Sequence, residues 1–348
     1  MRILITTQKV DKDDDVLGFF HNWIIKLAPH FSEVHVIALS VGKHDLPKNV
    51  HVYSLGKRRG DSGYLKTLRY IVRFYKYLFM LSGKYDAVFS HMNPEYIILA
   101  GWYWRLSDKK VFLWYNHKKG GLRLRFASLF SHKIFYTSPS AFTSRYKKSE
   151  KMPVGVDTEL CKDIEVKREK NSLLSLGRIS PVKNVEVIIE ALSLLNKEGI
   201  SFTSYIYGDP TDKDLSYYKE VLQGSENLTE EGALTFNKGV PYEKTPRIYS
   251  AYEIFINATP SGSFDKTILE AINCGMIPVI CNEAFGKDFP KELLFTEGDS
   301  KDLKNKLEKL FNKNAEEKKE LQKYLREHIL KEHSLDDLIL LLSDEIRS

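Results

Sequence analysis

Two loops combine charged and small residues at points where a predicted strand gives way to a helix. In 174-LSLGRISPVKN-184 a strand ends at Gly177, and Arg178 and Lys183 follow before a helix. An arginine and a lysine on such a loop can converge on one anion, because arginine supplies a planar fork of donors and lysine a point charge. Two solvated surface cations on an ordinary loop are an equally open alternative.

The second loop opens 261-SGSFDKTILEAINCG-275, which reads as a small-residue loop, a helix and a glycine stop before the apolar run 276-MIPVIC-281. A helix N-terminus attracts anions through its free N–H groups and its dipole. Gly262 and Ser263 would allow close approach of a ligand to the backbone. Asp265 is expected as the N-cap of this helix.

These loops lie within a regular alternation of short apolar runs and helical patterns, which predicts parallel, doubly wound α/β sheets. Ligands of such sheets bind at the carboxyl ends of the strands. The expected strands are 2–6, 33–39, 86–90, 110–115, 133–138, 152–157, 172–177, 202–208, 234–239, 253–258 and 276–281. Helices are expected near 17–29, 63–82, 95–106, 184–196, 214–223 and 244–249, after Asp265, and over about 300–348.

The alternation is interrupted by the charged stretch 162–171, which is typical of a linker. We therefore expect an N-terminal domain over 1–160 and a second domain over 171–325. An amphipathic C-terminal helix within 326–348 is expected to pack back on the first domain.

Composition narrows the class of partner. The 348 residues carry 52 basic and 46 acidic side chains, and this net charge of +6 suits anionic substrates or membrane surfaces but is too diffuse to predict nucleic acid. The three cysteines form no CxxC pair, so neither a disulfide framework nor a zinc site is expected. No signal-peptide pattern and no apolar run of roughly 20 residues occurs, which favours a cytoplasmic protein.

Four motifs in order resemble the retaining GT-B glycosyltransferases of family 4, the glycosyl transferases group 1. They are MPVGVD, SLGRISPVKNVEVIIEAL, YGD and TPSGSFDKTILEAINCGMIPVI. The resemblance implies two Rossmann-like domains that face each other across a cleft. It also implies a nucleotide-diphosphate sugar donor in the C-terminal domain, an acceptor in the N-terminal domain and no obligatory metal or other cofactor.

The resemblance also implies roles for individual residues. Arg178 and Lys183, beside Gly177, would hold the donor diphosphate, where fixed cations stabilise the departing negative charge. Glu270 is similar to the family glutamate that accepts hydrogen bonds from the nucleotide ribose, although a simple i,i+4 pair with Lys266 is possible. The remaining donor contacts would come from Gly262, Ser263, Phe264, Asp265, Lys266 and Thr267.

One position departs from the family pattern. The first glutamate of the family pair would stand eight residues before Glu270, where this chain has Gly262. That glutamate usually faces the donor sugar, so sugar recognition is expected to be altered. The backbone N–H groups of Gly262 to Phe264, or the side chains of Ser263 and Asp265, are the expected substitutes.

On the acceptor side, 111-VFLWYNHKKGG-121 places His117 just after a strand, and it looks like the cleft histidine of the family. A histidine there can donate to a sugar hydroxyl or to developing charge, although a lone histidine is more often structural. His91 and Asn93 follow the preceding strand and are weaker candidates to line the acceptor side.

Two further charged segments each allow a functional and a structural interpretation. The run Asp13 to Asp15 resembles a metal-binding DxD, but acids before a helix also complement its dipole, which we favour. The segment 64-YLKTLRYIVRFYKYLFML-81, with 57-KRR-59 before it, could touch anionic lipid as a peripheral contact. A crossover helix with snorkelling cations is the favoured alternative.

The sequence thus predicts a cytoplasmic, hexosyltransferase-type enzyme that moves a sugar to a hydroxyl of a glycan or lipid-linked acceptor with retention. Two alternatives stay open: a GT-B sugar-nucleotide epimerase, and a catalytically silent protein that binds nucleotide sugars.

Overall fold

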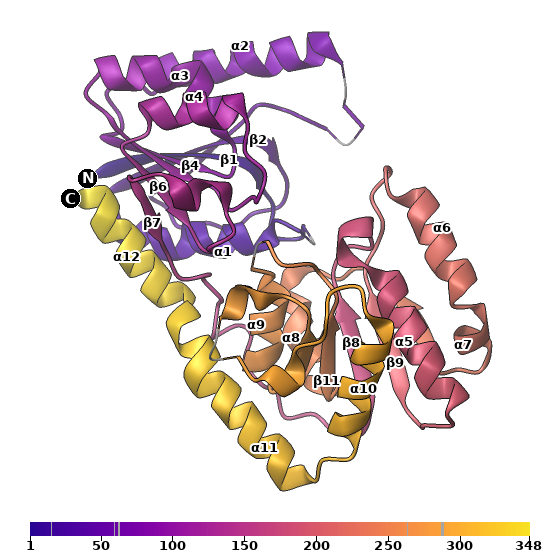
Figure 1. Ribbon diagram of the computed structural model, residues 1–348. Helices are drawn as coiled ribbons and strands as arrows, with labels where there is room; N and C mark the ends of the chain where they lie inside the picture. The colour runs from indigo at the N-terminus through magenta and orange to yellow at the C-terminus, as the bar shows by residue number, and fades with distance from the viewer. Residues whose placement is uncertain (15, 59, 62, 263, 287–288) are drawn as a thin grey trace. The chain divides into compact units, whose positions relative to one another are not determined.

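The chain forms two compact units, which Figure 1 colours from indigo at the N-terminus to yellow at the C-terminus. The computed structural model describes residues 1–14, 16–58, 60–61, 63–262, 264–286 and 289–348. Unit 1 comprises Met1–Pro153 and Asp336–Ser348, and unit 2 comprises Val154–Leu335. Within the described residues, no helix is both long and apolar enough to cross a membrane.

Unit 1 is built on a seven-stranded parallel sheet with the order β3-β2-β1-β4-β5-β6-β7. Its central strands read as nearly continuous apolar runs because both faces are covered, as in β4, where every residue is buried. The strands are β1 (Arg2–Val10), β2 (Glu33–Val41), β3 (Val50–Ser54), β4 (Ala87–His91), β5 (Lys110–Trp114), β6 (Lys133–Tyr136) and β7 (Ser149–Lys151).

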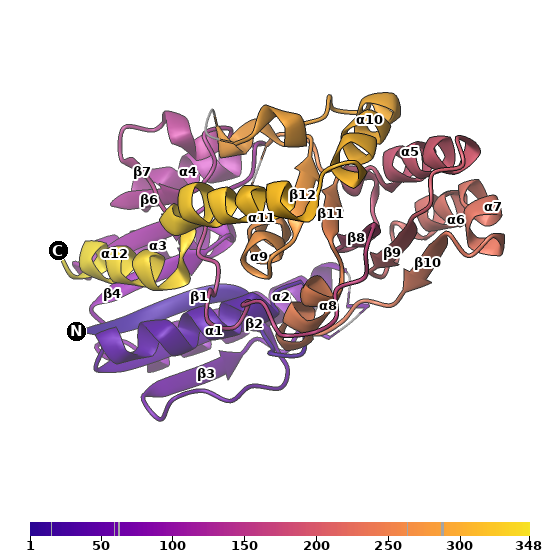
Figure 2. The ribbon, with the colours of Figure 1, turned by 90° about the horizontal axis from the view of Figure 1, so that it is seen from below.

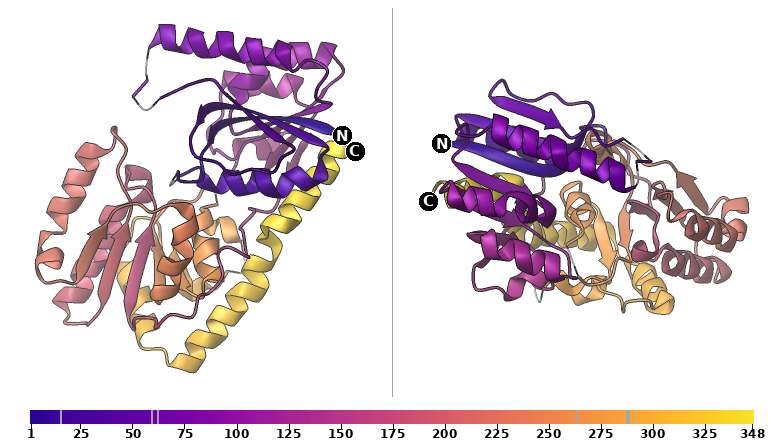
Figure 3. Two further views of the ribbon diagram at one scale, coloured as in Figure 1. Left: turned by 180° about the vertical axis from the view of Figure 1, so that it is seen from behind. Right: turned by 90° about the horizontal axis from the view of Figure 1, so that it is seen from above.

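Helices cover both faces of this sheet. In Figure 1, α2, α3 and α4 lie on one face, and α1 and α12 lie on the other; Figure 3 shows the same layers from behind and from above. The helices are α1 (Gly18–Leu27), α2 (Tyr64–Met80), α3 (Pro94–Leu106), α4 (Leu122–Phe130) and α12 (Leu335–Arg347), with short 3-10 turns at Ala28–His30 and Phe142–Arg145.

Unit 2 repeats the architecture with a five-stranded parallel sheet in the order β10-β9-β8-β11-β12. Helices α5 and α10 cover one face, and α8 and α9 cover the other (Figure 2). The strands are β8 (Ser172–Leu176), β9 (Thr203–Tyr207), β10 (Leu234–Asn237), β11 (Ile254–Asn257) and β12 (Ile277–Ile280). The helices are α5 (Val185–Lys197), α6 (Leu215–Gly224), α7 (Glu226–Glu230), α8 (Thr245–Ala251), α9 (Lys266–Asn273), α10 (Ser300–Phe311) and α11 (Ala315–Tyr324). Short 3-10 turns lie at Pro181–Lys183, Tyr242–Lys244, Glu283–Phe285, Lys291–Leu293 and Lys331–His333, and Leu325–Leu330 forms a π-helical turn.

The prediction of two doubly wound α/β sheets is confirmed, but the predicted strand 152–157 is wrong. The strand at this point is β7, and the following residues form only a bridge between Val156 and Ser334. Pro153 has no N–H for a ladder, and Gly155 has a φ of +76°, so the chain leaves the sheet here. Strand β3 and helices α4 and α7 were not predicted from the sequence. The predicted domain bounds at 160, 171 and 325 stay predictions.

Helix α12 completes the core of unit 1. Its residues Leu338, Leu342 and Ile346 are fully buried, whereas Leu341 is 47% exposed. Ion pairs with Lys26 and Lys133 hold the ends of the helix through Asp336 and Glu345. The apolar stripe, not these partly exposed charges, is expected to contribute most of the free energy of docking.

We therefore expect Leu342→Ala to lower the free energy of unfolding of unit 1 by about 2–5 kcal/mol, because it leaves a cavity in a close-packed core. Leu341→Ala on the same helix is the matched control and should stay within about 0.5 kcal/mol of the parent. Urea unfolding of both variants tests this. Equal losses in the two variants would show that α12 does not pack as described.

Candidate functional site

Both predicted anion-binding loops emerge at one edge of the sheet in unit 2. Strand order reverses between β8 and β11, because β8 pairs with β9 on one side and with β11 on the other. Ligands of open α/β sheets bind outside the carboxyl ends of the strands at such a switch point. The loop 177–183 follows β8 and the loop 258–265 follows β11, so the topology places them side by side.

The backbone at this edge packs too closely for side chains. Gly177 and Gly208 follow the neighbouring strands β8 and β9, with φ values of +147° and +159°. A Cβ atom on Gly208 would lie 1.9 Å from the carbonyl oxygen of Gly177. Only glycine fits at position 208, and this close contact fixes the start of the loop that carries Arg178 and Lys183.

An ion pair between Lys183 and Asp265 joins the two loops. Asp265 also accepts hydrogen bonds from Asn257 Nδ2 at 2.8 Å, from Thr259 Oγ1 at 3.2 Å, and from Thr267 Oγ1 and N at 2.8 and 3.4 Å. Burial alone would raise the pKa of Asp265, but the Lys183 ammonium and these donors outweigh burial and lower it to about 2.

These contacts give Asp265 two structural functions. It caps α9 through the Thr267 amide, as expected from the sequence, and it orients the Lys183 side chain. A carboxylate offers about four lone-pair sites, and Asp265 already receives five hydrogen bonds or ion-pair contacts. No capacity remains for a sugar hydroxyl unless one of these donors leaves.

Arg178 differs from Lys183 in having an exposed side chain. No carboxylate of the described chain lies within ion-pair distance of it. The hollow between its loop and β11 measures only about 10 Å³, which is room for about one water. A larger ligand would therefore contact the outer surface of these loops in unit 2.

Two further ionisable side chains lie on α9: Lys266 is its first residue, and Glu270 follows about one turn later. Glu270 is 4% exposed and accepts a hydrogen bond from Tyr249 Oη at 3.2 Å. Lys266 donates to the Gly155 carbonyl at 3.0 Å. Burial raises the pKa of Glu270 to about 7 despite the nearby Lys266, and burial lowers the pKa of Lys266 to about 7 despite Glu270.

The structure describes three of the remaining residues that were predicted for the donor loop. Gly262 is buried, and Thr267 lies in the first turn of α9 beside Asp265. The Phe264 ring packs edge-on against Phe285, with ring centroids 4.9 Å apart. Ser263 lies outside the described residues.

In unit 1, His117 lies on the exposed loop after β5, at the carboxyl edge of the sheet. Its carbonyl accepts a hydrogen bond from the Phe142 amide at 2.9 Å. Removal of part of its hydration lowers the pKa of the imidazole, which favours the neutral form. His91, by contrast, is buried and stacks on Phe20 with ring centroids 3.9 Å apart, so it belongs to the core.

The acidic loop before α1 serves local structure. Asp14 pairs with Lys9 and accepts hydrogen bonds from the amides of Val16 and Leu17, so it complements the start of α1 as expected. Asp15 lies outside the described residues. Across the part of the chain that the structure describes, no group of three or more His, Cys, Asp or Glu side chains could hold a metal ion.

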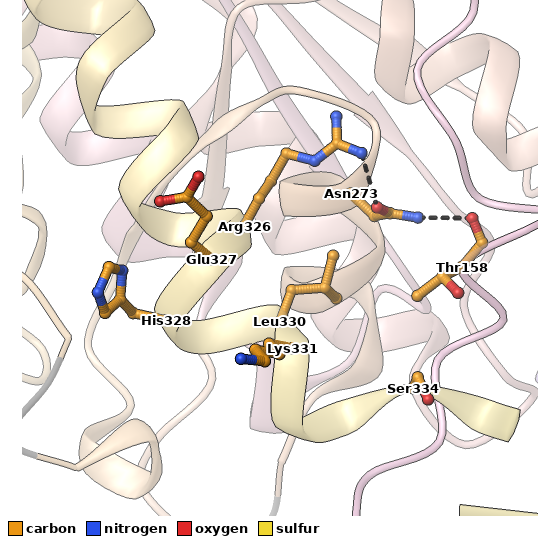
Figure 4. Close-up of a pocket in the computed structure, with 8 residues that line it drawn as sticks. All are labelled: Thr158, Asn273, Arg326, Glu327, His328, Leu330, Lys331 and Ser334. Atoms are coloured by element: carbon orange, nitrogen blue, oxygen red, sulfur yellow. Dashed lines mark hydrogen bonds between the residues drawn. The ribbon is translucent and has the colours of Figure 1, made fainter. Parts of the chain in front are cut away.

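A larger hollow of about 600 Å³ lies at the other end of α9, around the π-helical turn Leu325–Leu330 (Figure 4). Asn273 donates to the Thr158 carbonyl at 2.9 Å and receives a contact from Arg326 at 3.5 Å. None of the predicted site residues lines this hollow. It is therefore separate from the site at the N-terminus of α9.

Sequence reasoning missed several residues that build the site. Asn257 and Thr259 hold Asp265, Tyr249 holds Glu270, and Gly208 supports Gly177. A polar asparagine at the carboxyl end of an otherwise apolar strand was a readable signal for Asn257. The contact of Tyr249 depends on the fold and had no comparable signal, whereas Gly208 lies in the motif YGD, for which no such contact was predicted.

The chain is similar in part to a known protein family and in fold to solved structures. Residues 157–328 match the family model described as glycosyl transferases group 1, and this segment contains both loops of the site. The structure is similar to the crystal structure of Anabaena Alr3699/HepE in complex with UDP, with a TM-score of 0.79, 16% sequence identity and coverage of 100% of both chains. It is also similar to the glycosyltransferase WaaG, with a TM-score of 0.68, 15% identity and coverage of 99% of both chains.

The chain has the GT-B fold. Curated relatives match shorter segments. The GtfA subunit of the UDP-N-acetylglucosamine–peptide N-acetylglucosaminyltransferase of Streptococcus parasanguinis is 28% identical over 139 residues, which is 40% of this chain and 26% of that protein. The O-antigen chain mannosyltransferase B of Escherichia coli is 30% identical over 110 residues, which is 31% of this chain and 28% of that protein. The chain therefore spans about a quarter of the length of these relatives.

The lowered pKa of Asp265 predicts how the stability of the fold depends on pH. Because the pKa of Asp265 falls from 3.8 to about 2 on folding, the carboxylate stabilises the fold above pH 3.8 and loses this effect as the pH falls to 2. The full effect is about 2 kcal/mol, and about half of it is lost by pH 3. The stability advantage of the parent over Asp265→Asn should therefore shrink between pH 5 and pH 3.

Urea unfolding at several pH values measures this difference. Asp299→Asn is the matched control, since Asp299 caps α10 through the amides of Lys301 and Asp302 and has no ion pair with a described residue. A parent-to-variant difference at Asp265 that stays constant from pH 7 to pH 3 would contradict the assignment.

Proposed function

We propose that the chain is a retaining glycosyltransferase of glycosyltransferase family 4, which moves a sugar from a nucleotide-diphosphate sugar to a hydroxyl of a glycan or lipid-linked acceptor. The observation that carries this proposal is the pairing of the cationic loop after β8 with the N-terminus of α9 at the switch point. The group 1 match over both loops, and UDP in the structure of Alr3699/HepE, support it.

In this proposal the donor diphosphate meets Arg178 and Lys183. The departing diphosphate gains negative charge in the transition state, and preorganised cations lower the barrier because they need no reorganisation. Lys183 commits one of its three N–H donors to Asp265, so two remain for phosphate oxygens. Gly177 and Gly262 let the phosphates approach the backbone, as does the first turn of α9 at Lys266 and Thr267.

Glu270 is proposed to accept hydrogen bonds from the ribose hydroxyls. Its side chain is held by Tyr249 and lies one turn from the phosphate-binding end of α9, which suits a ligand that extends from the phosphates. Burial raises the pKa of Glu270 to about 7, and a ribose hydroxyl that donates to the carboxylate would favour its ionised form. No obligatory metal or other cofactor, and a cytoplasmic location, are part of the same proposal.

Unit 1 is proposed to receive the acceptor, with His117 near the reacting hydroxyl. A neutral imidazole can accept or donate a proton at a sugar hydroxyl. Contact with a lipid surface is proposed for α2, whose side chains Leu65, Leu68 and Val72 are 79%, 45% and 61% exposed.

The first test is the diphosphate contact. Arg178→Ala should reduce turnover of the donor on the order of 100-fold, by the loss of one charge-stabilising donor. Thermal shifts against a panel of nucleotide-diphosphate sugars identify the donor, and release of nucleoside diphosphate measures turnover. Lys197→Ala removes an exposed cation at the far end of α5 and is the matched control. Parent-like turnover of the Arg178 variant at saturating donor would remove this loop from the mechanism.

A second test separates the acceptor side from the donor side. His117→Ala should lower transfer by roughly 100-fold, the typical size of a general acid–base contribution, and leave donor affinity unchanged. Calorimetry with the donor and transfer kinetics measure the two effects. The control is His51→Ala, an exposed histidine of β3. A joint fall of donor affinity and thermal stability in the His117 variant would mark the residue as structural.

A further inference from the structure

A cationic hollow lies in unit 1, between the loop after β3 and the first turns of α2. It has a volume of about 410 Å³. We name it the α2 basic pocket and define it by its cations Lys57, Arg58, Lys66, Arg69 and Arg73. Arg59 of the same basic run lies outside the described residues.

The charges of this pocket are unbalanced. Among its described lining residues, Asp61 is the one carboxylate. Asp61 pairs with Lys66 at 2.6 Å and accepts a hydrogen bond from Tyr70 Oη at 2.7 Å. No carboxylate of the described residues lies within ion-pair distance of Lys57, Arg58 or Arg69. Like charges gathered in one hollow repel each other, so the pocket is suited to an anionic ligand.

The pocket is held in shape by contacts of its own. Arg73 donates from Nη1 to the Leu55 carbonyl at 2.8 Å and lies against Gly56. Gly56 has a φ of +81°, and a Cβ atom there would lie 1.9 Å from Arg73 Nη1. Asp61 fixes Lys66 and Tyr70 on the opposite wall. These contacts reduce the ordering that ligand binding would require.

A second hollow of about 410 Å³ adjoins the pocket and shares Lys57, Asp61, Lys66 and Tyr70 with it. It extends to Gln8 in β1 and to Asn93 just after β4. The order of the seven strands reverses between β1 and β4, so this second hollow reaches the ligand-binding edge of the sheet. A ligand with its polar body at this edge could place an anionic group in the α2 basic pocket.

We infer that the α2 basic pocket binds a phosphate ester carried by the acceptor substrate. The inference rests on the proposed transferase function and adds the chemical class of the acceptor. Several cations, including arginines that can each hold two oxygens, match the charge and the oxygen count of a phosphate or diphosphate better than those of a single carboxylate.

Two sources can supply such a group: a soluble sugar phosphate and a lipid-linked phosphate. The exposed Leu65, Leu68 and Val72 lie on the same helix as three of the pocket cations. The test must therefore include a phosphate ligand that carries a lipid chain. Binding of hexose 1-phosphate and of farnesyl diphosphate compares the two sources directly. Binding of either ligand supports the phosphate-ester site. The ligand with the higher affinity identifies the source that the pocket prefers.

The decisive variant combines Arg58→Ala with Arg69→Ala, because both side chains are exposed and their removal leaves the Asp61 and Arg73 contacts intact. Lys76→Ala with Lys84→Ala removes the same charge from exposed positions of unit 1 outside both hollows and is the matched control. Each pair is made in the full chain that also carries Arg178→Ala, which weakens competing binding at the donor loops. Calorimetry with inorganic diphosphate, hexose 1-phosphate and farnesyl diphosphate measures affinity.

The Arg58 and Arg69 pair should lower the affinity for inorganic diphosphate on the order of 10- to 100-fold, since two charge-assisted contacts are lost. The control pair should stay within about twofold, and the difference should narrow at high salt. Equal affinity of the two double variants for inorganic diphosphate would contradict the proposal that the α2 basic pocket binds phosphate groups. Donor turnover in the parent chain is measured separately: its absence would sink the transferase proposal, even with the anion site in place.

Discussion

The ion pair between Lys183 and Asp265 is the constraint on which the site in unit 2 depends. It connects residues 82 positions apart and closes the gap between the loop after β8 and the helix after β11. A charge this close to the interior is stable only when it is paired and hydrogen-bonded, since its desolvation is otherwise costly. Asn257 and Thr259 therefore matter as much as the two charges, because they complete the shell of the carboxylate.

Two further ionisable side chains, Lys266 and Glu270, extend this constraint along α9. The side chain of Lys266, the first residue of α9, reaches the Gly155 carbonyl, and Val156 beside Gly155 forms a bridge with Ser334. The motif MPVGVD is thus not a strand but an anchor for the first turn of α9. Glu270 remains on the helix with Tyr249, so each member of the pair has its own uncharged partner. This arrangement holds two ionisable groups near α9 with pKa values shifted toward each other.

The sequence predicts the parts of this structure that depend on local pattern. Period-2 and helical patterns located most strands and helices, and the loops after β8 and β11 were found because carboxyl ends of parallel strands share an edge. The predicted strand 152–157 was wrong because Pro153 and Gly155 outweigh its apolar character. Strand β3 was missed because its residues are mostly half-buried at the edge of the sheet.

Contacts between side chains far apart in the sequence could not be predicted from local pattern. Nothing near Asp265 in the sequence indicates Lys183 as its partner, and nothing near Gly56 indicates that Arg73 lies against it. Both contacts follow from where crossover helices return the chain. The site residues assigned from family resemblance stay predictions, but the structure shows that Lys183 and Thr267 share Asp265 as a partner.

The charges near the start of α9 indicate different functions for Arg178 and Lys183 in the proposed site. Asp265 is ionised at neutral pH, so from a distance it cancels most of the field of Lys183. It also occupies the Thr267 amide, which reduces what the dipole of α9 offers to an incoming anion. Arg178 has no ion-pair partner among the described residues, so in the proposed transferase it would contribute most of the long-range attraction of a diphosphate. Lys183 would act at contact distance instead, because its ammonium has two N–H donors besides the one that it gives to Asp265. With Gly262 in place of a glutamate and the oxygens of Asp265 already occupied, the sugar contacts expected from the sequence would fall to Ser263 or to the backbone N–H groups of this loop.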